Sequence, residues 1–256
     1  VFLDNLKTAT PWVLKAVGVE YLLNQTAHNP QANLLHIAAH LSNLLKVSEH
    51  VVVRRMAGAA LLEVAPQLTV DRRNEIAVEL SKALESGQTE ISQYIPACLG
   101  QFALWLPPRE LDELLEDLIS LLASPNTGVA AAALSTMGTM LEHYAVYPQR
   151  FSAAGGTWPI RRREMAAQLL KGLALRQEDV RQEALHILGG LFASQAMSEE
   201  DRTFLFTLTA KKILFLIGEQ PEEELTFFYT AAALSHIYRF LVRHGIESGP
   251  FQFRTP

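Results

Sequence analysis

The sequence predicts an all-α protein built as an array of helical repeats. A nine-residue pattern that begins at Val53 occurs again at Ile91, Val129 and Val180. Leu, Ala and Glu, which form helices well, dominate the composition over β-branched and aromatic residues. Short turns separate the helical segments, and no segment reads convincingly as a strand. Because pairs of helices stack into a solenoid, we expect a right-handed superhelix of about five pairs with an additional N-terminal helix.

The four copies of the pattern share one register. The first three begin 38 residues apart, and the fourth follows 51 residues later, an excess close to the length of the Gly- and Pro-containing stretch 146–160. Steps of four and eight residues fall on one stripe of a helix. The residues at these steps are small or apolar, and glycine follows in three copies, which favours close approach of neighbouring helices. They are Ala57 and Leu61, Ile95, Leu99 and Gly100, Ala133, Met137 and Gly138, and Ala184, Leu188 and Gly189.

This pattern resembles the HEAT-repeat family. The second helix of a HEAT repeat typically opens with Val-Arg and then has Ala and Leu at these intervals. Val53-Arg54 and Val180-Arg181 carry the match best, and residues 31–193 are covered well. The copies at Ile91 and Val129 keep the apolar positions but lack the arginine. The resemblance implies HEAT/ARM-like packing in which the second helices line an inner face.

Caps and breakers place the helices before the stretch 146–160. Thr10 can cap the first helix, with Pro11 at its first position. Ser48 can cap the third helix, and Pro66 ends it. Pro96 lies within an expected helix and predicts a kink near Ser92. The helices expected here are 11–27, 31–47, 48–65, 69–84, 90–106, 109–123 and 127–144.

The remaining chain continues the alternation of helix and turn. Ser198 can cap a helix whose first turn carries Glu199, Glu200 and Asp201, where the helix dipole favours acidic residues. The chain begins at Val1 without a Met, and we expect it to be a segment of a longer protein. The helices expected here are 161–175, 177–193, 198–217 and 222–242, before an irregular tail at 244–256. One solenoid domain, 1–256, then contains pairs at about 31–66, 69–106, 108–144, 160–194 and 198–243, with an insertion loop at 146–160.

Composition narrows the possible environments and partners. The 256 residues are 49% hydrophobic and 19% charged, which is a globular composition, and the formal net charge is −5. That charge disfavours a nucleic-acid partner, because phosphate binding needs a basic surface. Cys98 is the only cysteine, so no intrachain disulfide can form, and a reducing compartment such as the cytoplasm is expected. The sequence has neither a signal peptide nor an apolar run long enough to span a membrane.

No group of residues in the sequence clearly indicates a catalytic site, a cofactor-binding site or a metal site. His36 and His40 are one helical turn apart and are the weak candidates for metal ligands, but the pattern lacks the Glu of the zinc-protease motif. We therefore favour a solvated polar face for both. No nucleophile elbow or glycine-rich phosphate loop occurs. Cys98 lies on a motif helix, and we expect a buried structural thiol.

The candidate partner-binding residues lie in two places. Arg161, Arg162 and Arg163 follow Trp158 at the start of an expected helix, where cations oppose the helix dipole. The cluster can bind phosphate or an acidic partner, or it can be a solvated helix start. The expected inner face is small-sided and nearly uncharged, with Glu63, Gln101 and His186 among its larger side chains. Such a face suits a helix or peptide better than a polyanion.

These observations favour a non-catalytic scaffold over an enzyme. We expect a protein-interaction or regulatory segment of a larger intracellular protein, which holds a partner chain or a neighbouring domain on its concave face. The alternative is a HEAT-like DNA glycosylase or another nucleic-acid-acting enzyme, for which Trp105 and Trp158 supply aromatic side chains. A third possibility, a carrier or lyase scaffold for a small ligand, has no specific residue to support it.

Overall fold

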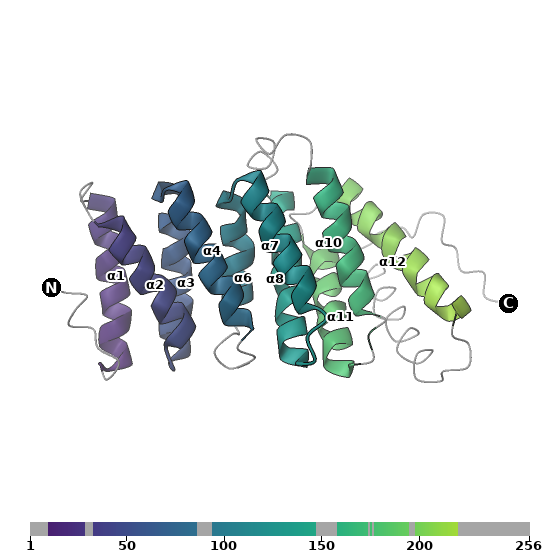
Figure 1. Cartoon of the computed structure of the whole chain (residues 1–256), viewed down its shortest axis with the longest axis horizontal. Coiled ribbons are helices and arrows are strands. Elements are labelled where there is room, and N and C mark those ends of the chain that lie inside the picture. Colours follow the sequence, from purple (N-terminus) through teal and green to yellow (C-terminus); the bar gives the residue numbers. More distant parts are fainter. Residues whose placement is uncertain are drawn as a thin grey trace.

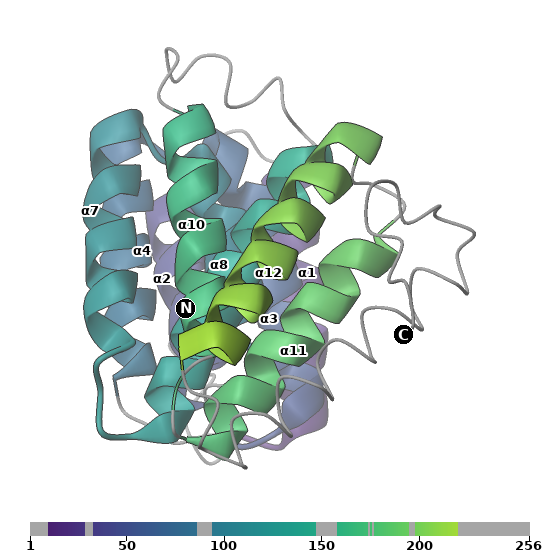
Figure 2. The same cartoon turned by 90° about the vertical axis from the view of Figure 1, so that its right-hand side faces the viewer.

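The helices stack in two layers along one axis. The computed structural model describes residues 10–28, 33–85, 94–146, 158–173, 175, 177–194 and 198–219, and no strand occurs among them. One layer contains the first helices of the pairs, and the other contains the second helices and α1 (Figures 1 and 2). The first-helix layer consists of α2 (Leu34–Val47), α4 (Val70–Leu84), α7 (Pro108–Leu121) and α10 (Trp158–Gly172). The first helix of the last pair, α12 (Glu199–Glu219), packs against α10 and runs obliquely across the end of the array (Figure 2). The second-helix layer consists of α1 (Trp12–His28), α3 (Val51–Val64), α6 (Ile95–Phe102), α8 (Thr127–Val146) and α11 (Glu178–Ala193).

The repeated pattern forms the core of the second-helix layer. Its apolar positions point at the first-helix layer and at the neighbouring second helices, and all of those described are buried. In α3 the residues Val53, Ala57 and Leu61 have no exposed surface. Each second helix packs against the helix that precedes it in the chain and against the second helix of the repeat before. The prediction of an all-α superhelical repeat is therefore confirmed.

Several helices begin at other residues than the sequence predicted. The prediction that α3 starts at Ser48 was wrong. Ser48 ends α2, and His50 precedes α3 without a side-chain cap. In contrast, the Thr69 hydroxyl accepts a hydrogen bond from the Arg72 backbone N–H and caps α4 as a helix former should. Helix α10 begins at Trp158, three residues before the predicted start, because Pro159 is tolerated in a first turn.

Pro96 stands in the first turn of α6, where it costs little. The α-helix begins at Ile95, so the missing N–H of Pro96 would have had no partner within the helix. The kink predicted near Ser92 lies outside the described residues. After Phe102 the chain tightens into the short 3-10 helix η3 (Ala103–Trp105), as α3 does into η2 (Ala65–Gln67). The loop residues 147–157, the expected helix 222–242 and the tail 244–256 also lie outside the described residues.

Glycines set the spacing between second helices. A Cβ atom built on Gly100 of α6 would lie 2.6 Å from Thr139 Cβ and 2.8 Å from the Thr136 carbonyl oxygen on α8. A Cβ on Gly138 of α8 would collide with Ile187 Cγ2 on α11. Non-bonded carbon atoms pack at about 3.5–4.0 Å, so neither helix pair can hold its spacing with a larger residue. The glycine that follows the motif is therefore a packing residue, as the sequence predicted.

We expect Gly100→Ala to destabilise the protein by about 1–3 kcal/mol, because the added methyl group meets backbone as well as side-chain atoms. Gly190→Ala on α11 is the matched control, since a Cβ there meets nothing within 4 Å. It should stabilise by about 0.5–1 kcal/mol through helix propensity. Urea unfolding followed by circular dichroism measures both changes. Equal effects of the two substitutions would contradict the packing role of Gly100.

Candidate functional site

The outer surface of the second-helix layer is the strongest candidate for a binding face. We call it the open face, and define it by the residues six and ten positions after the start of each motif copy. Because a helix turns about 100° per residue, these positions lie opposite the buried stripe. The open face consists of Ala59, Glu63, Ala97, Gln101, Ser135, Thr139, His186 and Gly190. Five of these residues are exposed, and Gln101, Ser135 and Thr139 are half-buried.

Polar groups on the open face are partly satisfied by their own helices. The Thr139 hydroxyl donates a hydrogen bond of 3.0 Å to the Ser135 carbonyl oxygen. The Gln101 side-chain amide donates one of 3.1 Å to the Ala97 carbonyl oxygen. A side chain that already forms a hydrogen bond with its own helix backbone extends little from the surface and leaves few polar groups for a ligand to satisfy. The central part of the open face therefore carries uncharged polar groups whose hydrogen bonds are largely satisfied within their own helices.

A groove of about 450 Å³ crosses the open face between α3 and α6. Apolar side chains dominate its lining, with two arginines on the α3 side and no carboxylate among the residues that the structure describes. The lining residues are Val52, Arg54, Arg55, Met56, Gly58, Ala59, Leu62, Tyr94, Ala97, Cys98 and Gln101. Arg55 is exposed, whereas the Arg54 guanidinium is buried with its carbon 5.8 Å from the centre of the Tyr94 ring. Grooves of this size and composition typically accept apolar anchors of a ligand or peptide.

Cys98 lies beneath this groove as a structural thiol, which confirms the sequence expectation. It is buried, and its thiol donates a long hydrogen bond of 3.7 Å to the Gly58 carbonyl oxygen. Burial raises the pKa of Cys98 to about 12. A thiol with so high a pKa is not a nucleophile at neutral pH.

The two histidines considered as metal ligands have different environments. His36 is exposed, as expected, but the expectation of a solvated His40 is wrong. His40 is half-buried at the side of α2 that approaches α1, and desolvation, together with the charge of Lys15, lowers its pKa below the usual 6.5. The described residues contain no group of three or more His, Cys, Asp or Glu side chains able to hold a metal ion.

The three consecutive arginines have three different roles. Arg161 is buried and forms a two-point ion pair with Asp112 of α7, including a contact of 2.5 Å between Nη2 and Oδ2. Arg162 pairs with Asp201 of α12. Arg163 is exposed, and its guanidinium carbon lies 5.9 Å from the centre of the Phe204 ring. The ion pairs explain how cations are tolerated in the first turns of α10 despite the helix dipole.

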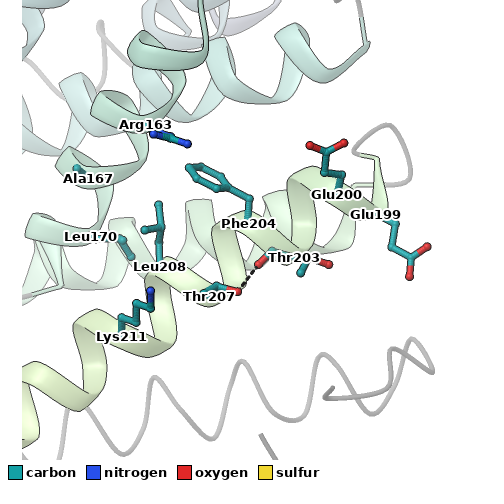
Figure 3. Close-up of a pocket in the computed structure, with 10 residues that line it drawn as sticks. All are labelled: Arg163, Ala167, Leu170, Glu199, Glu200, Thr203, Phe204, Thr207, Leu208 and Lys211. Atoms are coloured by element: carbon teal, nitrogen blue, oxygen red, sulfur yellow. Dashed lines mark hydrogen bonds between the residues drawn. The ribbon is translucent and has the colours of Figure 1, made fainter. Parts of the chain in front are cut away.

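Trp158 is the first residue of α10, and its side chain lies outside the described part of the structure. A second cleft, of about 970 Å³, lies between α10 and α12 (Figure 3). Ala167 and Leu170 of α10 face Phe204 and Leu208 of α12 across it, and Arg163 points toward Phe204. This cleft joins two first helices and is therefore separate from the groove on the open face.

The sequence did not reveal the role of Arg73 or the groove residues Arg55 and Tyr94. Arg73 Nε and Nη2 donate to the carbonyl oxygens of Ala65 and Pro66, at 2.9 and 3.0 Å, and its Nη1 donates to that of Trp105 at 3.1 Å. It thus satisfies carbonyl groups at the end of one second helix and ties them to the next. In the structure Arg73 and Arg161 are both the fourth residue of a first helix, a correspondence that the predicted helix starts at 69 and 161 did not show.

The two-layer stacking of helical pairs defines the class of the protein as an α-solenoid of the HEAT and armadillo type. No protein-family model matches the chain, and no curated protein matches it in sequence. Among solved structures the chain is similar to Kap121p bound to Nup53p, at 14% identity and a TM-score of 0.49, over 93% of this chain and 24% of that one. It is also similar to a designed armadillo repeat protein in complex with the peptide (KR)4, at 17% identity and a TM-score of 0.35, over 84% and 98%. An engineered protein matches at 18% identity and a TM-score of 0.36, over 82% and 85%. At these identities the likeness concerns the fold alone.

Helices able to cross a bilayer are not found in the described part of the chain, since none combines sufficient length with sufficient apolar character.

We expect Asp112→Asn to destabilise the protein by about 1–3 kcal/mol, because the buried Arg161 loses its charged acceptor. Asp117→Asn is the matched control on the same helix, where the side chain is exposed, and it should change stability by less than about 0.5 kcal/mol. Thermal unfolding measures both. Indistinguishable melting temperatures for the two variants would show that the ion pair does not hold α10 on α7.

The low pKa of His40 predicts a loss of stability in mild acid. Below pH 6.5 the unfolded chain binds a proton at this residue that the folded chain resists, so stability should fall as the pH drops from 6.5 toward the folded pKa. His40→Gln should remove part of this dependence, and His36→Gln, one turn away and exposed, should leave it intact. Urea midpoints measured between about pH 8 and about pH 5 test the difference. The idea fails if both variants keep the wild-type dependence.

Proposed function

We propose that the chain is a non-catalytic protein-interaction module that holds a helix or an extended peptide of a partner protein on the open face. The groove between α3 and α6 carries this proposal, because it offers apolar anchoring sites on an otherwise smooth, nearly neutral surface. A neighbouring domain of the same polypeptide is a partner of the same kind. Cys98 as the single cysteine supports a cytoplasmic setting.

The shape of the open face favours a rod-like ligand. The small residues Ala59, Ala97 and Ser135 occupy equivalent positions on three successive helices. A ligand lying along this row would contact several repeats at once without displacing side chains. Its apolar anchors would fill the groove beside Met56 and Leu62, and Arg55 at the rim would pair with a carboxylate of the partner.

The remaining candidate residues extend this surface. Glu63 and His186 are exposed on the open face at either end of the row, and Gln101 lines the groove. We propose that these three residues set the specificity at the edge of the contact, where polar groups usually lie. Of the arginine cluster, Arg163 is the member that we assign to partner contacts, because Arg161 and Arg162 form ion pairs within the chain.

A photo-crosslinking experiment tests whether a partner protein binds at the open face. A benzoylphenylalanine placed at Ala59 or Ala97 should crosslink the same partner in the native cell, and one placed at the exposed Asp117 of α7 should not. Ala59→Trp should then weaken binding of the recovered partner roughly tenfold or more, about 1.4 kcal/mol, by filling the groove. Asp117→Trp is the control for a bulky exposed residue and should leave affinity unchanged.

Two results would contradict the proposal. One is crosslinking that depends on Asp117 and not on Ala59 or Ala97. The other is tight, salt-sensitive binding of duplex DNA in a filter assay at low salt, which would favour the glycosylase alternative. A circular-dichroism melt of each tryptophan variant must match the wild type, so that lost binding is not lost folding.

A further inference from the structure

Helix α1 has two apolar faces, and one of them is about half exposed. The buried face carries Val19 and Leu22 and packs mainly against α3. The other face carries Val13, Leu14, Val17 and Tyr21, whose exposed fractions are 50%, 55%, 55% and 45%. At roughly 100° per residue, these four side chains spread over roughly 100° of the helix, the width of a stripe that normally faces a core. We call them the α1 stripe. The α1 stripe occupies the first three turns of α1, and the exposed polar residues Asn24 and His28 follow on the same side toward its C-terminal end.

The position of α1 shows what is missing beside it. Helix α1 stands in the second-helix layer next to α3 (Figures 1 and 2), and the ring of Trp12 stacks on that of His50, with 4.1 Å between centroids. The described second helices α3, α6, α8 and α11 each pack against two earlier neighbours: the first helix of their own pair and the second helix of the preceding pair. Among the residues that the structure describes, no helix occupies either of these positions beside α1, and the α1 stripe is on a different side of the helix from the buried Val19 and Leu22.

We propose that the α1 stripe is the stacking surface for a further helical pair of this same array, which precedes α1 in the natural polypeptide. Continuity of the interface carries the assignment: the next pair would repeat the contact that α1 makes with α3. Repeat arrays bury such faces with another repeat or end them with a polar capping helix, and the α1 stripe is not polar. The pair should present an amphipathic first helix of about four turns, with one buried apolar face like those of α2 and α4.

Thiol labelling tests the proposal. Val17→Cys is placed in the 256-residue chain and in the full-length natural polypeptide, and the rate of maleimide reaction is measured in each. A natural polypeptide without a helical pair before α1 overturns the proposal. Cys98 is buried and does not compete. We expect Cys at position 17 to react at least roughly tenfold more slowly in the natural polypeptide, because a packed helix opens only by local unfolding. Val78→Cys on α4, where the valine is 38% exposed, is the matched control and should react equally in both.

A second variant keeps the test independent of the cysteine. Val17→Lys should leave the melting temperature of the 256-residue chain nearly unchanged and lower that of the natural polypeptide, whereas Val78→Lys should behave alike in both. Equal labelling of position 17 in the two proteins overturns the proposal. Protection that already exists in the 256-residue chain also overturns it: a rise with protein concentration would assign the stripe to a second copy, and loss on deleting residues 1–9 would assign it to that segment.

Discussion

The close approach of the second helices at glycine is the constraint on which the rest of the structure depends. Gly100 faces Thr139 and Gly138 faces Ile187, so α6, α8 and α11 sit at a spacing that a single methyl group would disturb. That spacing lets the apolar stripe of each helix reach both the first-helix layer and its neighbour. Long side chains next to these glycine contacts would have to point away from the helix surface. Most positions of the open face therefore carry short side chains. The geometry that packs the layer therefore also shapes the surface that we assign to a partner.

Charged side chains form a second kind of contact between repeats, which adds to the apolar packing. Arg73 links the carbonyl groups that end α3 and η2 to that of Trp105, and Arg161 links α10 to Asp112 of α7. Each tie joins one repeat to an adjacent one, which matches the nearest-neighbour character of a solenoid. Arginine suits this role because one guanidinium group can serve several acceptors with fixed geometry. The arginines that resemble a binding cluster in the sequence thus include residues that connect repeats as well as residues that remain exposed on the surface.

The sequence contained most of the fold and little of the candidate site. The 38-residue period and the stripe of Val53, Ala57 and Leu61 predicted the second helices and their buried side, because periodicity is local information that survives in one chain. Helix starts were less accurate, as Ser48 and Trp158 show, since caps depend on how neighbouring helices meet. The groove could not be predicted, because Arg55 and Tyr94 become neighbours only when two repeats pack. The ion pair between the buried Arg161 and the half-exposed Asp112 joins residues in two repeats, and no local pattern encodes it.

The open face and the α1 stripe both follow from which sides of a second helix are covered by its neighbours in the array. A helix in the middle of the array has its flanks covered by equivalent neighbours, so only its outer side remains for other molecules, and there small side chains such as Ala59, Ala97 and Ser135 alternate with a few larger polar ones. A helix without an earlier neighbour keeps the apolar flank that packing would have hidden, as Val13 and Val17 do. Large apolar side chains in one contiguous exposed patch indicate a surface that is normally covered, whereas the open face combines small exposed side chains with one apolar groove. The chemistry of the side chains is thus the ground on which we assign the α1 stripe to permanent stacking and the open face to exchangeable binding.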